Sequence, residues 1–204
     1  MEKKKARIAV LVSGGGTNLQ AILDAEASGL LRSGEVTLVI SDRAGAYALT
    51  RAEKAGVPAR LIEKKAAGSQ VAFEEKLTEA LEENGTDLIV LAGFLSILSE
   101  RFTSRFARRI LNVHPSLIPS FCGAGFYGLK VHEAALARGV KVTGATVHFV
   151  NEIPDGGEIL AQKAVDILPG DTPETLQRRV MEQAEWVILP RSVEKVCADI
   201  LARG

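Results

Sequence analysis

The stretch Ile8-Ala-Val-Leu-Val12, followed by Ser13-Gly-Gly-Gly-Thr-Asn18, decides the fold class of this 204-residue chain. Five apolar residues in a row indicate a short strand buried on both faces, as is typical of parallel sheets. The glycines predict a tight turn, and the apolar spacing from Leu19 to Leu31 predicts a helix directly after it. A strand, a tight turn and a helix in this order are the opening unit of an α/β fold.

The same alternation continues along the chain. Runs rich in branched apolar residues predict further strands at 36–40, 59–62, 87–92, 110–113, 142–150 and 158–167. Helical spacing predicts helices at 46–54, 69–81, 96–109 and 129–138, and a final helix from Asp171 with a break at Pro190. We expect a Rossmann-like, mostly parallel sheet with helices on both faces. Its last two strands should be antiparallel, because only a short loop separates them.

The composition limits the possible partners. Hydrophobic residues make up 47% of the chain, and 25 basic residues balance 25 acidic ones, so the formal net charge is zero. A chain without a basic excess is not expected to bind nucleic acid or an anionic membrane surface. No apolar run approaches the length of a membrane span. We therefore expect a globular protein that binds small molecules.

The cysteines and histidines argue against a metal centre. Cys122 and Cys197 are too few for a disulfide framework or a zinc ligand set, which favours a reducing, cytoplasmic location. No pair among His132, Glu133 and His148 has the spacing of metal ligands. We predict that the protein uses no metal.

A second informative stretch is Ile110-Leu-Asn-Val-His-Pro-Ser-Leu-Ile-Pro-Ser120. Asn112 and His114 lie two residues apart at the end of a predicted strand, so both side chains point to the same face. An amide donor and an imidazole at one place can stabilise a developing oxyanion, and the imidazole can also transfer a proton. The alternative is a strand end at which Asn112 starts a turn and His114 packs.

The glycine-rich turn is a candidate phosphate site. Its backbone N–H groups lie at a helix N-terminus, which favours an anion. It lacks the lysine of a Walker A loop, and Leu19 stands where the dinucleotide fingerprint has its third glycine. We favour a monophosphate site. The alternatives are a plain tight turn and a dinucleotide site that uses Asp42.

Two further segments could belong to the same site. Asp155, in Asn151-Glu-Ile-Pro-Asp-Gly-Gly157, would stabilise the protonated form of His114 if it lay beside it. The segment Gly93–Leu98 is apolar except for Ser96 and could wall the pocket of a flat heterocycle. The alternatives are an Asp-Gly turn between strands and a strand end that packs into a helix.

These four segments should lie close together. The stretches 13–18, 93–98, 112–116 and 151–157 all follow predicted strands. Ligands of open α/β sheets bind at the carboxyl ends of the strands, near a switch in strand order. We therefore expect all four segments to gather at one edge of the sheet.

Three motifs together resemble the glycinamide ribonucleotide formyltransferase family. They are Asn112-Val-His-Pro-Ser-Leu-Ile-Pro119, Ser13-Gly-Gly-Gly-Thr-Asn-Leu-Gln20, and Gly144-Ala-Thr-Val-His-Phe-Val150 with Asp155-Gly-Gly157. The resemblance covers nearly the whole chain in order. The Asn-x-His-Pro-Ser core is shared with other enzymes that handle folate-bound formyl groups, and the phosphate loop and short length narrow it to this family.

The resemblance implies a single formyltransferase domain over residues 1–204, with a nucleotide-binding half at about 1–100 and a folate and catalytic half at about 101–204. It implies transfer of a formyl group from 10-formyltetrahydrofolate, the co-substrate, to the amine of glycinamide ribonucleotide in de novo purine biosynthesis. The substrates would be small molecules, the location cytoplasmic and the assembly a monomer or a homodimer.

The resemblance also implies roles for individual residues. Asn112 and His114 would stabilise the oxyanion on the formyl carbon, and Asp155 would pair with His114. The nucleotide would be held by Gly16, Thr17, Asn18, Gln183 and Glu185, of which Glu185 matches the ribose-contacting acid better than Gln183. The folate would be held by Leu95, Ser96, Ile97, Leu98, Asn151, Glu152, Ile153 and Pro154.

The chain departs from common family members at several positions. Ser96 stands where many members have arginine. Gln70 stands where many have a basic residue for the nucleotide, a role that Lys64 or Lys65 could take. The loop Phe121–Tyr127 is longer than in several members.

Other functions compete with this interpretation. A formyltetrahydrofolate hydrolase resembles this core but has an N-terminal regulatory domain, and a first strand that begins by Arg7 is expected to leave no room for one. Formyltransferases acting on aminoacyl-tRNA have a further C-terminal domain, for which we expect this chain to be too short. A non-catalytic nucleotide-binding module using Ser13–Asn18 would bind phosphates and ignore folate.

Overall fold

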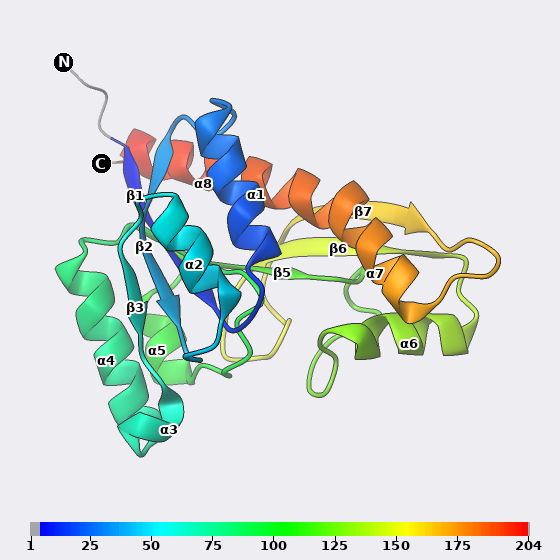
Figure 1. The fold of residues 1–204 in the computed structure, drawn as a ribbon, viewed down its shortest axis with the longest axis horizontal. Helices are drawn as coiled ribbons and strands as arrows, with labels where there is room; N and C mark the ends of the chain where they lie inside the picture. Colours follow the sequence, from blue (N-terminus) through cyan, green and yellow to red (C-terminus); the bar gives the residue numbers. More distant parts are fainter. Residues whose placement is uncertain (1–4, 204) are drawn as a thin grey trace.

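The computed structural model describes residues 5–203 and contains a seven-stranded mixed sheet (Figure 1). The strands lie in the order β3-β2-β1-β4-β5-β6-β7. Their bounds are β1 Ala6–Val12, β2 Gly34–Ser41, β3 Ala59–Leu61, β4 Leu88–Leu91, β5 Ile110–His114, β6 Val142–Phe149 and β7 Ile159–Asp166. The pairs among β1 to β5 are parallel, and β6 and β7 pair antiparallel. The predicted fold class is confirmed.

Helices cover both faces of this sheet. They are α1 Thr17–Ala27, α2 Tyr47–Lys54, α3 Lys64–Ala67, α4 Gln70–Glu83, α5 Glu100–Arg105, α6 Leu129–Arg138, α7 Pro173–Val180, the π-helical turn η1 Met181–Glu185 and α8 Trp186–Arg203. Figure 1 shows α7, η1 and α8 following one another in one long rod. None of the helices in residues 5–203 is long and apolar enough to cross a membrane.

Strand β1 is buried on both of its faces because it feeds two separate cores. Ile8 and Val10 pack in one core, with apolar side chains of α1, α2, α7 and α8. Ala9 and Leu11 point the other way and pack with α4 and α5. A period of two therefore explains why the continuous apolar run forms a central strand.

Two predicted features of the helices are wrong. The helix expected over 96–109 is only α5, because Ser99 caps it by accepting a hydrogen bond from the N–H of Phe102, and residues before the cap form a loop. The expected break at Pro190 is absent, and α8 runs through it. Pro190 removes only the bond to the carbonyl of Trp186, the residue at which the π-helical turn gives way to α8.

The topology brings the loops after β1 and β4 together. The chain leaves β1 toward β2 on one side, whereas β4 pairs on the other side, so the strand order switches between them. The Ser13 N–H donates to the carbonyl of Gly93 at 3.2 Å, and the Leu95 N–H donates to Ser13 Oγ at 2.8 Å. Segments 13–18 and 93–98 thus share one edge of the sheet, as expected for a ligand site.

Loop 151–157 reaches the same place by a different route. Because β6 runs antiparallel to β5, the end of β6 lies beside the start of β5, where the Val150 N–H donates to the carbonyl of Ile110 at 2.9 Å. The loop then turns back toward His114. The expectation that all four segments meet is correct. Segment 151–157, however, follows a strand that ends at the opposite edge of the sheet, and it reaches the site by folding back.

The return of this loop depends on Gly157. A Cβ atom there would lie 1.8 Å from the carbonyl oxygen of Phe149, so no side chain fits. We predict that Gly157→Ala lowers the free energy of unfolding by about 1–3 kcal/mol or more, measured by chemical denaturation. Gly45→Ala is the matched control, because a Cβ at Gly45 has nothing within 4 Å. Equal loss in both variants would contradict this account of the loop.

Candidate active site

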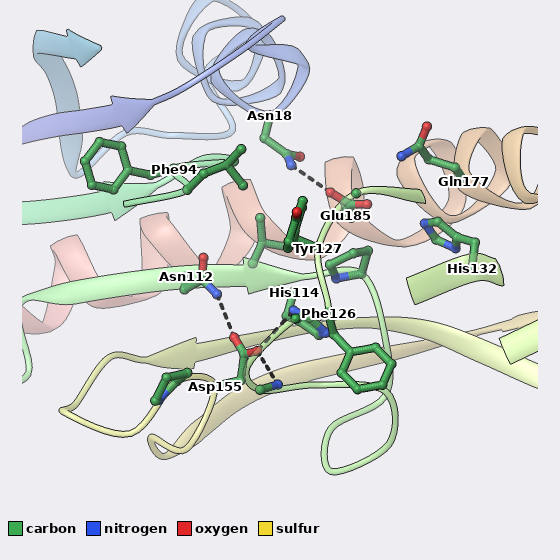
Figure 2. Close-up of a pocket in the computed structure, with 18 of the residues that line it drawn as sticks. Asn18, Phe94, Asn112, His114, Phe126, Tyr127, His132, Asp155, Gln177 and Glu185 are labelled. Atoms are coloured by element: carbon green, nitrogen blue, oxygen red, sulfur yellow. Dashed lines mark hydrogen bonds and ion pairs between the residues drawn. The ribbon is translucent and has the colours of Figure 1, made fainter. Parts of the chain in front are cut away.

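A cavity of about 560 Å³ opens where the ends of β1, β4 and β5 meet (Figure 2). It contains the candidate catalytic residues and most of the candidate nucleotide-binding residues. The sequence-predicted catalytic and nucleotide-binding residues in its wall are Thr17, Asn18, Asn112, His114, Asp155 and Glu185, and the candidate folate residues Leu95, Ile97 and Pro154 also line it. Residues separated by more than 160 positions in the sequence therefore face one space.

Asp155 is the centre of a polar network in this cavity. Its Oδ2 accepts a hydrogen bond from the backbone N–H of Gly123 at 2.9 Å and lies 3.4 Å from His114 Nδ1. Its Oδ1 lies 3.3 Å from the amide nitrogen of Asn112 and 3.5 Å from His148 Nε2. The three side-chain contacts are longer than an ordinary hydrogen bond, so a reacting group can replace them without breaking a strong interaction.

Asp155 is held in an unusual backbone conformation. Its φ is +56°, in the left-handed region that residues other than glycine rarely adopt. Such conformations cost energy and persist where the surrounding structure requires them. Here the reversal of the loop and the contacts of the carboxylate hold Asp155 in this conformation.

The environment of Asp155 keeps its carboxylate charged. Burial alone would raise the pKa of this carboxyl group, but the contact with His148, the neighbouring His114 and the hydrogen bond from the N–H of Gly123 outweigh it. The net effect holds the pKa of Asp155 below its usual range. A negative charge therefore lies beside two imidazoles at neutral pH.

His114 faces an acceptor at each ring nitrogen. Nδ1 lies beside the Asp155 carboxylate, and Nε2 is 2.9 Å from the carbonyl oxygen of Phe121. Carboxylate and carbonyl oxygens only accept hydrogen bonds, so both are satisfied together when the ring carries a proton on each nitrogen. The loop that starts at Phe121 contacts both His114, through the carbonyl of Phe121, and Asp155, through the N–H of Gly123.

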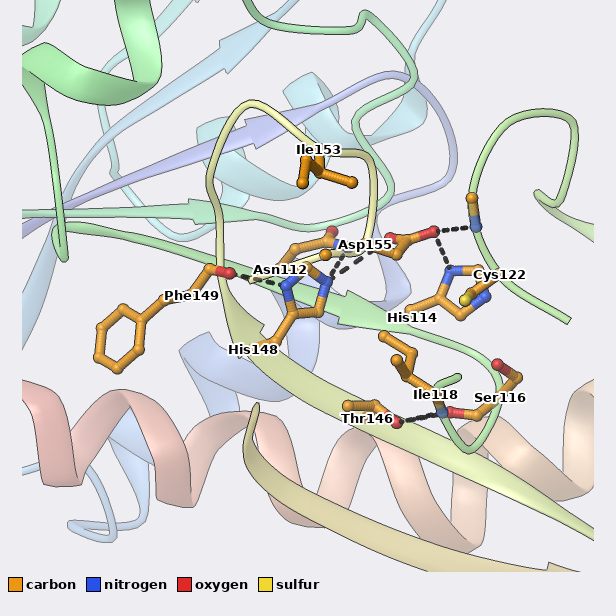
Figure 3. Close-up of polar contacts among 12 residues, drawn as sticks. Asn112, His114, Ser116, Ile118, Cys122, Thr146, His148, Phe149, Ile153 and Asp155 are labelled. Carbon is orange, nitrogen blue, oxygen red and sulfur yellow. Dashed lines mark hydrogen bonds and ion pairs between the residues drawn. The ribbon is translucent and has the colours of Figure 1, made fainter. Parts of the chain in front are cut away.

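His148 is a site residue that the sequence did not reveal. Its Nδ1 lies 2.8 Å from the carbonyl of Phe149, and its Nε2 lies 3.1 Å from the amide nitrogen of Asn112 (Figure 3). Because the carbonyl can only accept, Nδ1 carries a proton, and Nε2 faces both the amide of Asn112 and the carboxylate of Asp155. Asn112 and His148 are directly opposite each other in the β5–β6 ladder. The pairing register of β5 and β6 places these two residues together, and the register cannot be read from the sequence.

The nucleotide side of the cavity combines a helix start with a buried acid. Gly16 precedes α1 with φ +72°, and no side chain caps the helix, so its first N–H groups are free to bind an anion. Glu185 is 6% exposed, and its Oε2 accepts from Asn18 Nδ2 at 2.7 Å. The Oδ1 atom of Asn18 is buried without a partner among the described residues, so it can still accept from a ligand.

All eight candidate folate residues lie along a second, smaller cavity of about 130 Å³. Two of them, Ile97 and Ile153, are 66% and 57% exposed, the highest values among the large apolar side chains of the described residues, so they leave apolar surface open to a ligand. Ser96 donates to Asp42 at 2.6 Å instead of offering a positive charge. Asn112 and Asp155 line both cavities, so the two spaces meet at the polar network.

The structure also sorts the remaining nucleotide candidates. Gln183 is exposed and does not line the larger cavity, whereas Gln177 does. Gln70 donates to the carbonyl of Ile97 at 3.0 Å and does not itself line the cavity. Among the described residues of the cavity wall, Arg43 is the one with a permanently positive side chain, and it was not predicted.

Comparisons with known proteins agree on a family. A family model described as formyl transferase matches residues 6–193. The phosphoribosylglycinamide formyltransferase of Haemophilus influenzae is 43% identical over 184 residues, which is 90% of this chain and 84% of that protein. The chain belongs to the formyl transferase family.

Other relatives and solved structures extend this comparison. The trifunctional purine biosynthetic protein adenosine-3 of Bos taurus is 45% identical over 206 residues, which is 100% of this chain and 20% of that protein. This chain therefore spans about a fifth of the length of that relative. The crystal structure of glycinamide ribonucleotide transformylase 1 from Symbiobacterium toebii has a TM-score of 0.89 and 45% identity, over 96% of this chain and 89% of that one.

Among residues 5–203, no group of three or more histidine, cysteine, aspartate or glutamate side chains is arranged to hold a metal ion.

Burial of Glu185 yields a prediction for stability. Burial raises the pKa of this carboxyl group to about 7, and the hydrogen bond from Asn18 opposes the rise only in part. A raised pKa means that ionisation of Glu185 costs stability as the pH rises from about 4.5 to above 7. We predict that Glu185→Gln raises the free energy of unfolding by about 3 kcal/mol relative to the wild type at pH 8. At pH 4.5 the two proteins should have the same free energy of unfolding. The measurement is urea denaturation at both pH values, and an advantage that does not depend on pH would refute the assignment.

Proposed function

We propose that this protein transfers a formyl group from 10-formyltetrahydrofolate to the amine of glycinamide ribonucleotide, in de novo purine biosynthesis. The observation that carries the proposal is that two cavities of different chemistry meet at Asn112 and Asp155. The larger cavity has an open helix N-terminus and a buried acid, which suit a ribose phosphate. The smaller has an apolar wall, which suits a flat heterocycle.

In the proposed reaction, the amine nitrogen attacks the formyl carbon. The new C–N bond forms as the C=O electrons move to oxygen, and Asn112 and His114 donate hydrogen bonds to the oxyanion. Collapse re-forms the C=O bond and breaks the bond to the folate nitrogen. The amine loses one proton and the folate nitrogen gains one, so the step needs no oxidant or reductant. Asp155 stabilises the protonated His114 during this exchange.

The amine needs no covalent help from the protein. A deprotonated primary amine is already a good nucleophile, so the task of the site is to position two substrates and stabilise the charge. This proposal includes Gly16, Thr17, Asn18 and Glu185 for the nucleotide. It also includes the apolar segments on either side of the smaller cavity for the folate.

We propose a single formyltransferase domain, with a nucleotide-binding half at about 1–100 and a folate and catalytic half at about 101–204. Both halves contribute to the larger cavity, since Thr17 and Glu185 both line it. We further propose a cytoplasmic location and a monomer or homodimer. Two free cysteines, one of them buried, are consistent with a reducing compartment.

The proposed function is tested by following 10-formyltetrahydrofolate with and without glycinamide ribonucleotide. We expect consumption only when the nucleotide is present, with one formylated nucleotide formed per folate released. Consumption at the same rate without the nucleotide would instead support the formyltetrahydrofolate hydrolase. Binding of the nucleotide without any binding of folate would support a non-catalytic module.

We predict that Asn112→Ala and His114→Ala each lower kcat on the order of 100- to 1,000-fold, because each removes a donor to the oxyanion. The measurement is steady-state kinetics on variants whose circular dichroism matches the wild type. Gln183→Ala is the control and should keep wild-type kcat, since Gln183 is exposed outside the cavity. Near-normal turnover of either cavity variant would contradict the proposed oxyanion site.

We predict that Ile153→Ser raises the KM for 10-formyltetrahydrofolate on the order of 10-fold and leaves the KM for the nucleotide within about twofold. Ile153 is 57% exposed and lines the smaller cavity but not the larger one, so its contribution should be to the folate and not to the core or the nucleotide. An equal rise in both KM values would mean that the smaller cavity does not hold the folate.

A further inference from the structure

Of the three histidines of the chain, His132 is the one that lies outside the Asp155 network. It belongs to α6, is completely buried and lines the larger cavity. Neither of its ring nitrogens has a hydrogen-bond partner among the described residues. Figure 2 shows the ring on the side of the cavity where Gln177 and Glu185 lie, away from Asn112 and Asp155.

Two unpaired nitrogens on a buried ring are costly for a protein. A buried donor or acceptor without a partner costs about 1–3 kcal/mol, and most such groups are satisfied in folded proteins. The other two histidines follow this rule, since every ring nitrogen of His114 and His148 faces a polar atom. His132 therefore has unused hydrogen-bonding capacity at the wall of a cavity large enough for a ligand.

The charge state of His132 restricts what it can bind. Burial, with a smaller effect from nearby His114, lowers the pKa of His132 to about 4, so the ring is neutral at physiological pH. A neutral imidazole offers one N–H donor and one nitrogen acceptor. This combination suits a hydroxyl or an amide, which can also donate and accept. It suits a phosphate less well, because a phosphate dianion only accepts hydrogen bonds and would leave the acceptor nitrogen of the ring unpaired.

We propose that His132 is a substrate-binding residue that hydrogen-bonds a neutral polar group of the nucleotide, either a sugar hydroxyl or the amide of the glycinamide. This inference rests on the proposed function of the larger cavity. His132 lines the same cavity as Glu185 and Asn18 and is absent from the wall of the smaller one. Its partner therefore belongs to the nucleotide and not to the folate.

Calorimetric titration tests this assignment with three probes, glycinamide ribonucleotide, ribose 5-phosphate and inorganic phosphate. The variant is His132→Phe, which keeps a ring and removes both nitrogens. We expect the Kd for glycinamide ribonucleotide to rise on the order of 10-fold, and the Kd for inorganic phosphate to stay within twofold. A matching rise for ribose 5-phosphate assigns the contact to a sugar hydroxyl. A rise for glycinamide ribonucleotide alone assigns it to the amide.

Glu133→Gln is the matched control, because Glu133 is the next residue of α6 and is exposed away from the cavity. His132→Gln is the second variant, because it keeps a donor and an acceptor and should recover part of the lost affinity. It also keeps the test decisive if the phenylalanine variant does not fold. A Kd for glycinamide ribonucleotide within twofold of the wild type in a folded His132 variant would overturn the inference.

Failure of the inference and failure of the proposed function give different results. If the wild type does not bind glycinamide ribonucleotide at all, the proposed function fails. If the wild type binds it and the His132 variants bind equally well, only the role of His132 fails. As an independent readout, ring-nitrogen NMR of the wild type should show the His132 signals shifting when the nucleotide is added, and unchanged signals would also contradict the contact.

Discussion

The candidate site depends on one carboxylate, that of Asp155, and on the loop that delivers it. The carboxylate lies within 3.5 Å of Asn112, His114 and His148, and the N–H of Gly123 fixes one of its oxygens. Two of these side chains come from β5 and one from β6, so the two strands share a single electrostatic centre. If this charge were removed, two buried histidines would lose the carboxylate that both of them face.

The reversal of strand direction after β5 makes this arrangement possible. The loop that follows a parallel strand in this position would have left from the same edge of the sheet as the other loops. Antiparallel β6 instead ends beside the start of β5, and the loop after it must fold back. Gly157 permits the close approach of the Phe149 carbonyl, and the left-handed Asp155 completes the turn. The fold thereby places an acid from a turn opposite an amide and an imidazole from a strand.

Much of this was predictable from the sequence, for identifiable reasons. The continuous apolar run of β1 indicates burial on both faces, and the spacing of Asn112 and His114 indicates that they share one face of a strand. Both inferences depend only on local geometry. The roles of Asp155 and Glu185 came from the family resemblance, and the structure brings both residues to the cavity. His148, His132 and Arg43 were missed as site residues. Their positions depend on register and packing between distant segments, which single-residue patterns do not encode.

The errors have physical causes of the same kind. The run 96–109 has helical spacing, but the hydroxyl of Ser99 caps the helix at that point, and the buried acid Glu74 accepts from both the N–H and the hydroxyl of Ser99. Pro190 would break an isolated helix, yet here the missing hydrogen bond coincides with the end of a π-helical turn. The contact of Ser99 with Glu74 therefore overrides the helical preference of residues 96–98, and the π-helical turn before α8 lets the helix continue through Pro190.

The most direct test of the central role of Asp155 is the kinetics of Asp155→Asn, a substitution that keeps the size of the side chain and removes its charge. The measurement is the single-turnover rate of formyl transfer at saturating concentrations of both substrates, together with the Kd of each. We predict that the rate falls at least on the order of 100-fold while both Kd values stay within about threefold. A rate within threefold of the wild type would contradict the claim that this carboxylate organises the site.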